Sequence, residues 1–255
     1  MTAAAASASE GSWRGLHVAL RCRRSTATMA RVDLFVFDLA GTTVRDEDHV
    51  MRAFVDTASA FDLPADPAWL RPRMGWHKER VFAGLLDAHG QDPGEAAAMA
   101  RHFEAVFAAG VRARPLRPTP GACEALAALA GHGVRIAFNT GFARVTADVV
   151  LAAMGWQHWP SVASDEVVAG RPEPHLIHAA MQRVGVVDPA RVGVAGDTPA
   201  DLLAARAAGA ALRIGVGCGT HSLGELAAHP HTHLLADLSA LPELVLTEGG
   251  VPTDG

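Results

Sequence analysis

The chain has 255 residues and a formal net charge of −5, and about half of its residues are apolar. No apolar run approaches the ~20 residues of a membrane span, and no basic stripe indicates nucleic-acid binding. The length suffices for a full core and a small second domain. The three cysteines form no CxxC pair, which is typical of reduced thiols in a cytoplasmic protein. Tyrosine is absent, which excludes any tyrosine-based mechanism.

Residues 1–29 differ in composition from the rest of the chain. They are rich in alanine, serine and threonine, and they carry four arginines but only Glu10 as an acid. This composition resembles an organelle transit peptide. It also fits a disordered tail or a chain that begins at Met29, and we favour these simpler interpretations because composition alone is weak evidence for a targeting segment.

From residue 31 onward, strand-like segments alternate with helical patterns. The strand-like segments are residues 32–37, 134–138, 192–195, 212–216 and 233–235. The helical patterns between them include residues 123–130, 145–154, 176–184 and 202–208. Such alternation predicts an α/β fold with a doubly wound, parallel, Rossmann-like sheet.

One interval has helical patterns but no convincing strand. It contains helical patterns at residues 50–61, 78–89 and 95–111 and ends in a proline-rich connector. We therefore expect a helical cap at residues 46–115, a catalytic core at 31–45 and 116–245, and a C-terminal tail at 246–255. An insertion at this point would hang over the end of the first strand as a lid, although it could also serve only stability.

Candidate functional residues follow the ends of the predicted strands. The first strand ends in Asp38, and a Gly-Thr-Thr turn follows it. In open parallel sheets, ligands bind beyond the carboxyl ends of the strands. Thr140 follows the second strand, Arg171 lies in a proline-rich loop, and Asp197 and Asp201 follow the third strand.

Together these residues have the chemistry of a phosphoryl-transfer site. Asp38 and Asp197 can hold one hard cation such as Mg²⁺, with the backbone carbonyl of Ala40 as a further ligand. Thr140, Arg171 and the turn amides can bind phosphoryl oxygens, and the Asp38 carboxylate can attack phosphorus. Each signal alone could be a helix cap or a solvated loop residue. Their order and spacing favour the catalytic interpretation.

With these motifs the chain resembles the haloacid dehalogenase superfamily over about residues 31–245, and within it phosphonoacetaldehyde hydrolase (phosphonatase) and the phosphonatase-like hydrolases. The matching segments are DLAGTTV (38–44), TGF (140–142), AGRP (169–172) and GDTPAD (196–201). The resemblance implies a Rossmann-like core with a helical cap, Mg²⁺ as cofactor and a small phosphorylated or phosphonate substrate. It also implies a metal role for Asp201 and phosphate binding by Thr42, Thr43 and Gly141.

Ala40 stands where ordinary phosphatases of this superfamily carry an aspartate that protonates the leaving group. Phosphonatase instead uses a cap lysine that forms a Schiff base with the substrate aldehyde, so that the carbon leaves as an enamine. Its M-G-x-x-K motif matches residues 74–78, with Lys78 as the amine and Met74 and His77 as substrate contacts. A free lysine titrates near pH ~10.4, so this chemistry needs desolvation or nearby positive charge.

Other functions fit the same motifs. In capped relatives without a Schiff base, the equivalent cation only grips the substrate, as in an ordinary phosphomonoesterase of the phosphoglycolate phosphatase type. A non-catalytic sensor of phosphorylated metabolites is another alternative, whereas a mutase needs an acid–base group where Ala40 stands. We expect a cytoplasmic protein that binds neither nucleic acid nor membrane, and exposed cap helices could form a homodimer, as in some relatives.

Overall fold

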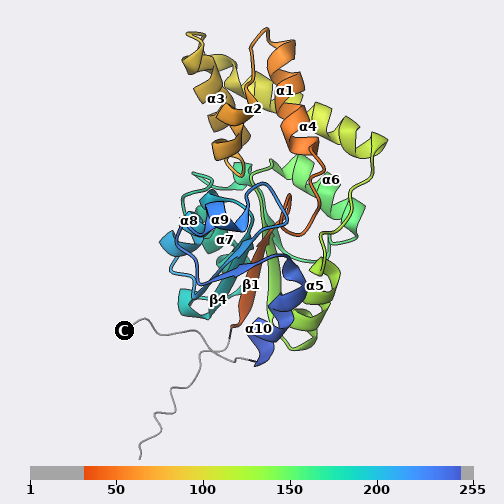
Figure 1. Ribbon diagram of the computed structural model, residues 1–255, viewed down its shortest axis with the longest axis vertical. Coiled ribbons are helices and arrows are strands. Elements are labelled where there is room, and N and C mark those ends of the chain that lie inside the picture. Colours follow the sequence, from red (N-terminus) through yellow and green to blue (C-terminus); the bar gives the residue numbers. More distant parts are fainter. Residues whose placement is uncertain (1–31, 248–255) are drawn as a thin grey trace, which may run out of the picture.

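The computed structural model describes residues 32–247, which form a core built on a sheet with a helical unit above it (Figure 1). The expectations for residues 1–29, and for a tail beyond residue 247, lie outside the described part of the chain. No helix between residues 32 and 247 combines the length and the apolar character that crossing a membrane requires.

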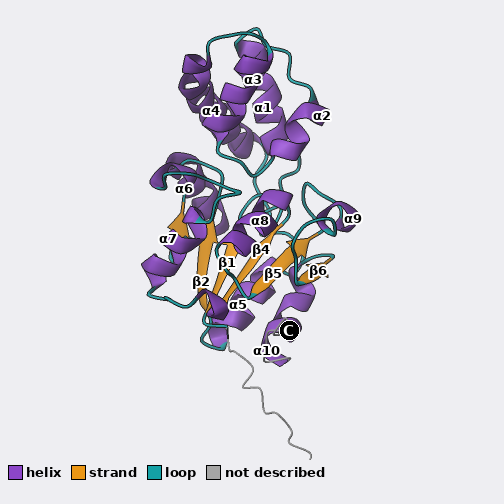
Figure 2. Ribbon diagram, turned by 90° about the vertical axis from the view of Figure 1, so that its left-hand side faces the viewer, coloured by secondary structure: helices purple, strands orange, loops and turns teal. Residues whose placement is uncertain are grey.

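The core sheet has six strands in the order β3-β2-β1-β4-β5-β6, and every pair of neighbours is parallel (Figure 2). The strands are β1 (Leu34–Asp38), β2 (Arg135–Asn139), β3 (Ser161–Val162), β4 (Val192–Gly196), β5 (Leu212–Val216) and β6 (His233–Leu235). The predicted doubly wound parallel sheet is confirmed. The prediction lacked β3, because a strand of two residues carries no periodic signal. The chain reverses its winding direction between β1 and β4, which is where ligands bind in such sheets.

Both faces of the sheet are covered by helices, which explains why β1 is apolar at consecutive positions. Phe35 and Phe37 pack in one layer, and Leu34 and Val36 pack in the other. The first layer contains α5 (Ala122–Gly131), α6 (Arg144–Met154) and α10 (Leu241–Thr247), and the second contains α7 (His175–Val184) and α8 (Pro199–Ala207). Because side chains alternate along a strand, a strand buried on both faces reads as a continuous apolar run. Asp38 breaks this run at its end.

Of the α-helices between β1 and β2, all except α5 lie beyond the carboxyl end of the sheet (Figures 1 and 2). They are α1 (His49–Ala60), α2 (Pro67–Leu70), α3 (Lys78–Ala88) and α4 (Ala96–Ala113). We call residues 46–115 the cap. Its interior is aromatic: the ring of Phe54 lies 5.3 Å from that of Phe82 and 4.8 Å from that of Phe103, between centroids. The prediction lacked the short α2, the four-residue α9 (Leu223–Leu226) and α10, which extends into the expected tail.

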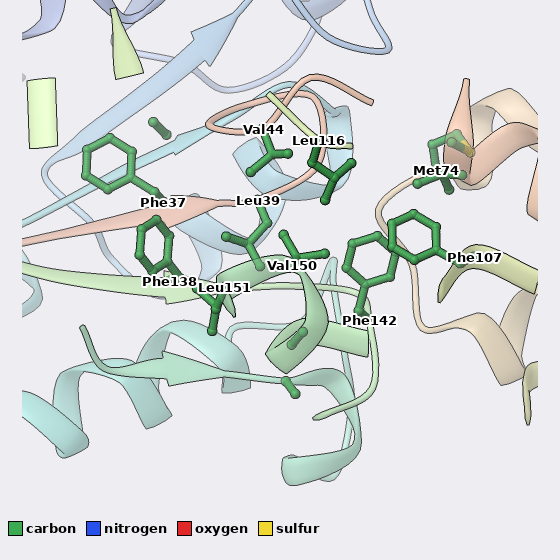
Figure 3. Packing of buried hydrophobic residues seen from close by; sticks show 14 of the residues in the cluster. Phe37, Leu39, Val44, Met74, Phe107, Leu116, Phe138, Phe142, Val150 and Leu151 are labelled. Atoms are coloured by element: carbon green, nitrogen blue, oxygen red, sulfur yellow. The ribbon is translucent and has the colours of Figure 1, made fainter. Parts of the chain in front are cut away.

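The cap is held against the core by its linkers and by contacts nearer the site. The two linkers run side by side, since the Arg45 N–H donates to the Arg117 carbonyl at 2.8 Å and the Thr119 N–H donates to the Thr43 carbonyl at 3.0 Å. Nearer the site, Phe107 of α4 packs on Phe142 of the core, with ring centroids 4.7 Å apart (Figure 3). The end of β1 is therefore enclosed between the sheet and the cap.

Candidate active site

The loop after β1 holds Asp38 in a fixed position. The Thr43 hydroxyl donates to the backbone carbonyl of Asp38 at 2.8 Å. Gly41 has φ +89°, and a Cβ at this position would lie 2.2 Å from Oδ2 of Asp197. Glycine is required here both by the backbone conformation and by the close approach of the second carboxylate.

Arg171 lies under Asp38, and the whole side chain is buried. Its Nη2 lies 2.7 Å from Oδ1 of Asp38 and donates to Oδ1 of Asn139 at 2.6 Å, while its Nη1 lies 2.9 Å from Oδ1 of Asp201. The guanidinium thus joins two buried carboxylates. From the sequence we expected Arg171 to bind phosphoryl oxygens. In this structure both terminal nitrogens of its guanidinium group are instead held by protein groups.

Asp197, at the start of the loop after β4, faces the same enclosed space as Asp38. Its Oδ1 accepts from the Thr42 hydroxyl at 3.1 Å, and its Oδ2 accepts from the Thr220 N–H at 2.6 Å. Burial raises the pKa of Asp197, and the negative charges of Asp38 and Asp201 raise it further. Burial likewise raises the pKa of Asp38, against the opposing effect of Arg171.

This pair of carboxylates fits a divalent cation. Two buried acids with raised pKa values are short of positive charge, and Mg²⁺ is held by one or two carboxylates plus water and substrate oxygens. Ala40 lines the same space and can add its carbonyl. Among residues 32–247, no group of three or more acid, histidine or cysteine side chains is arranged to hold a metal. Asp201 does not complete such a group, because Arg171 and Thr198 engage its two oxygens.

Lys78, the first residue of α3, brings an amine into this space from the cap. The side chain is buried, and its Nζ lies 5.3, 5.4 and 5.0 Å from the ring centroids of Phe54, Phe103 and Phe142. Burial lowers the pKa of Lys78 to about 8, while the charge of Asp38 raises it and that of Arg171 lowers it. The structure therefore supplies the desolvation that a nucleophilic lysine needs.

The sequence itself adds a further observation about this position. Of the 22 lysine and arginine residues in the chain, Lys78 is the single lysine. Everywhere else the chain uses arginine, which does not lose its proton in proteins. A buried site that needed only a positive charge could use arginine, so the lone amine favours a role that depends on deprotonation.

Some of the other predicted site residues line the space around Asp38, whereas others lie outside it. Thr140, Gly141 and Met74 line the space around Asp38, and Figure 3 shows Met74 near Phe142 at the cap boundary. A Cβ on Gly141 would lie 2.6 Å from the Gly75 carbonyl, so the cap backbone touches the core here. His77 is not part of this lining and borders a neighbouring hollow instead.

Several lining residues were not predicted from the sequence. They are Asp46, Val50, Thr198 and Thr220, together with the phenylalanines around Lys78. Asp46 lies two residues before Asp48, the N-cap residue of α1, and its Oδ1 accepts from the Val50 N–H in the first turn at 2.9 Å. The enclosed space measures about 20 Å³, close to the room one water needs. A substrate can therefore enter only if the cap moves.

Comparison with known proteins identifies hydrolases that resemble this chain. The model of the haloacid dehalogenase-like hydrolase family matches residues 32–209. A probable phosphatase, IndB, from Dickeya dadantii is 34% identical over 199 residues, covering 76% of this chain and 85% of its own. A phosphonoacetaldehyde hydrolase from Paraburkholderia xenovorans is 30% identical over 194 residues, covering 65% and 71%.

Solved structures share the fold. A hydrolase from Pseudomonas syringae superposes with a TM-score of 0.76 at 24% identity, covering 83% of this chain and 97% of its own. A phosphonoacetaldehyde hydrolase-like protein from Oleispira antarctica superposes with a TM-score of 0.73 at 19% identity, covering 89% and 96%.

Proposed function

Because this chain belongs to the haloacid dehalogenase-like hydrolases, we propose that it cleaves a small phosphonate or phosphate ester with Asp38 as the nucleophile. A carboxylate oxygen of Asp38 attacks phosphorus as the bond to the leaving group breaks, and water then hydrolyses the aspartyl-phosphate. Thr43 and Arg171 support this role because they fix the backbone and the carboxylate of Asp38. The closed cap would exclude bulk water during transfer.

The environment of Lys78 supports phosphonatase-like cleavage of a C–P bond. Lys78 is the single lysine of the chain, it shares a buried space with Asp38, and its pKa is lowered to about 8. A neutral amine can attack a substrate aldehyde and, after loss of water, form a protonated imine. This imine accepts the electron pair when the C–P bond breaks, so no acid at position 40 is required for the carbon to leave.

Hydrolases of this family generally use a divalent metal, and we propose Mg²⁺ here. Asp38, Asp197 and the carbonyl of Ala40 would hold it, and Asp201 would join them only after releasing Arg171. When bound, the ion neutralises charge on the phosphoryl oxygens. Thr140 and the amide of Gly141 would hold the phosphoryl group, with Met74 against the organic part. Thr42, whose hydroxyl donates to Asp197, and His77, which borders the neighbouring hollow, would contact substrate only after rearrangement.

An ordinary phosphomonoesterase is the second candidate. The name of the Dickeya relative, a probable phosphatase, favours it. In this case Lys78 would stay protonated and bind the substrate, and the leaving oxygen would need another source of protons because Ala40 has none.

The test is phosphate release from phosphonoacetaldehyde and from a panel of phosphate esters, with and without Mg²⁺. Asp38→Asn should abolish release from every active substrate, and persisting turnover would refute the nucleophile. Lys78→Arg should abolish release from phosphonoacetaldehyde if a Schiff base forms, but should only weaken binding if the cation grips the substrate. Tight binding without release from any substrate would indicate the sensor.

We further propose that the protein acts in the cytoplasm on a small substrate, without nucleic-acid or membrane partners. This fits the acidic balance of the chain. A homodimer through the cap helices stays a prediction, which analytical ultracentrifugation would test.

A further inference from the structure

Formation of a Schiff base requires a proton donor beside the amine. Addition of a neutral amine to an aldehyde gives a carbinolamine, and its hydroxyl leaves as water only when it receives a proton. The residue two positions after the nucleophile, Ala40, cannot supply it. The donor must therefore come from another group in the space around Lys78.

Within the described residues 32–247, five titratable side chains line this space, and four of them are already engaged or reacting. They are Asp38, Asp46, Lys78, Arg171 and Asp197. Asp38 is paired with Arg171, and Asp197 accepts bonds on both of its oxygens. Lys78 is the amine itself. Asp46 is the remaining acid.

Asp46 is well placed on the side of the space formed by the cap. It lies where the first linker enters α1, and the Val50 N–H holds its Oδ1 at 2.9 Å. It lines the enclosed space and also the adjoining outer hollow of about 480 Å³, so it stands where substrate and water would pass. In an in-line transfer the leaving group lies on the opposite side of phosphorus from Asp38, and this is the side of the cap.

The electrostatics connect Asp46 to Lys78. The positive charge of Lys78 lowers the pKa of Asp46, and the negative charge of Asp46 raises the pKa of Lys78. Burial is the largest effect on Asp46 and raises its pKa overall, with His49 and Asp48 as the other charged neighbours. The protonated acid is thereby more accessible near neutral pH than for an exposed aspartate.

We propose that Asp46 is the acid–base partner of Lys78, an inference that rests on the proposed Schiff-base function. Protonated Asp46 gives its proton to the carbinolamine hydroxyl, the C–O bond breaks, and water leaves. The nitrogen lone pair forms the C=N bond, which leaves a cationic iminium beside the Asp46 carboxylate. After C–P cleavage the enamine takes up a proton from water at the carbon that carried phosphorus, which gives the product iminium. Its hydrolysis reverses the dehydration: water adds to the C=N carbon, and a proton of that water returns to the Asp46 carboxylate.

The experiment measures how fast Lys78 becomes covalently modified by phosphonoacetaldehyde in the presence of borohydride, by mass spectrometry of the full chain. Asp38→Asn is present throughout, so that no C–P bond is cleaved. Adding Asp46→Asn should slow modification about 100-fold, within the range for loss of a general acid. Asparagine can still accept from the Val50 N–H, so this bond to the first turn of α1 and the melting temperature should be kept. Asp46→Glu should restore part of the rate, which a purely structural role would not explain.

Asp48→Asn is the matched control, because Asp48 is an exposed carboxylate of the same segment that lines only the outer hollow. It should change the rate less than twofold. Equal slowing by both asparagine variants would reveal a general charge effect and overturn the inference, as would an unchanged rate in Asp46→Asn; both leave the proposed function standing. If Lys78 is not modified in any of these proteins, including the Asp38→Asn protein that keeps Asp46, the Schiff-base function is overturned together with this inference.

Discussion

Replacing Lys78 by arginine should remove an amine that is unusually reactive at neutral pH. With its pKa lowered to about 8, about a quarter of Lys78 is neutral at pH ~7.5, against roughly one part in a thousand for a lysine at its ordinary pKa. The neutral amine is the form that attacks an aldehyde. Lys78 should therefore be modified roughly 200-fold faster than a solvent-exposed lysine at this pH.

The assay is borohydride trapping with phosphonoacetaldehyde across a range of pH, followed by mass spectrometry. The wild-type rate should rise with pH, reach half its maximum near pH 8, and level off about one to two pH units higher. Because Lys78 is the single lysine of the chain, Lys78→Arg leaves no side-chain amine to trap. The variant keeps the positive charge, so only the nucleophile is lost. Free Nα-acetyl-lysine is the reference for an ordinary amine.

Two results would contradict this reasoning. A half-maximal rate near pH ~10 would mean that burial does not lower the pKa of Lys78. Equal trapping in wild type and Lys78→Arg would place the reaction at the chain's N-terminal amine, outside the site.

Three further predictions concern the acids and the cap. In the absence of metal, the raised pKa of Asp197 means that the folded state binds more protons than the unfolded state above pH ~3.8, so stability should fall as pH rises from this value toward neutrality. In chemical denaturation, Asp197→Asn should flatten this dependence of stability on pH. It should also raise the free energy of unfolding of the metal-free protein near neutral pH by at least about 1 kcal/mol, while abolishing hydrolysis. An unchanged dependence of stability on pH would argue against a buried charge on Asp197. Thr42→Val removes a donor to Asp197 and should weaken Mg²⁺ or Mn²⁺ binding in calorimetry about 10- to 100-fold, whereas equal affinity would show that this hydroxyl does not orient the carboxylate. Gly141→Ala should push the Gly75 carbonyl away and lower kcat/KM at least about 10-fold without lowering the melting temperature of the core; full activity would mean that tight cap closure is not needed.

The core strands could be predicted because each is a compact apolar run whose length matches a strand. Residues 212–216 were predicted with the bounds of β5, and β1, β2 and β4 differ from the prediction by at most two residues at either end. Among the strands and α-helices that were missed, β3, α2 and α9 are two to four residues long and α10 has seven residues. Their positions depend on pairing and packing with distant segments, which a local pattern does not contain.

The proximity of Asp38 and Asp197 also followed from the order of the elements. Asp38 ends β1 and Asp197 follows β4, which are adjacent parallel strands, and the sheet reverses its winding between them. The partners of Arg171 did not follow, because Asn139 and Asp201 reach it from different loops. Nor did the phenylalanines around Lys78, which come from α1, from α4 and from the loop after β2.

The amino-acid sequence alone determined the kind of fold, the acid at the end of the first strand and the presence of one amine in the cap segment, because these depend on residue type and order. Only the tertiary structure decided what those groups can do. Whether Lys78 can lose its proton depends on how far packing of the cap removes it from water. The same packing decides whether Asp46 is an acid for the site or merely an acceptor for the first turn of α1. Desolvation is a property of the assembled surroundings, and no local stretch of sequence carries it.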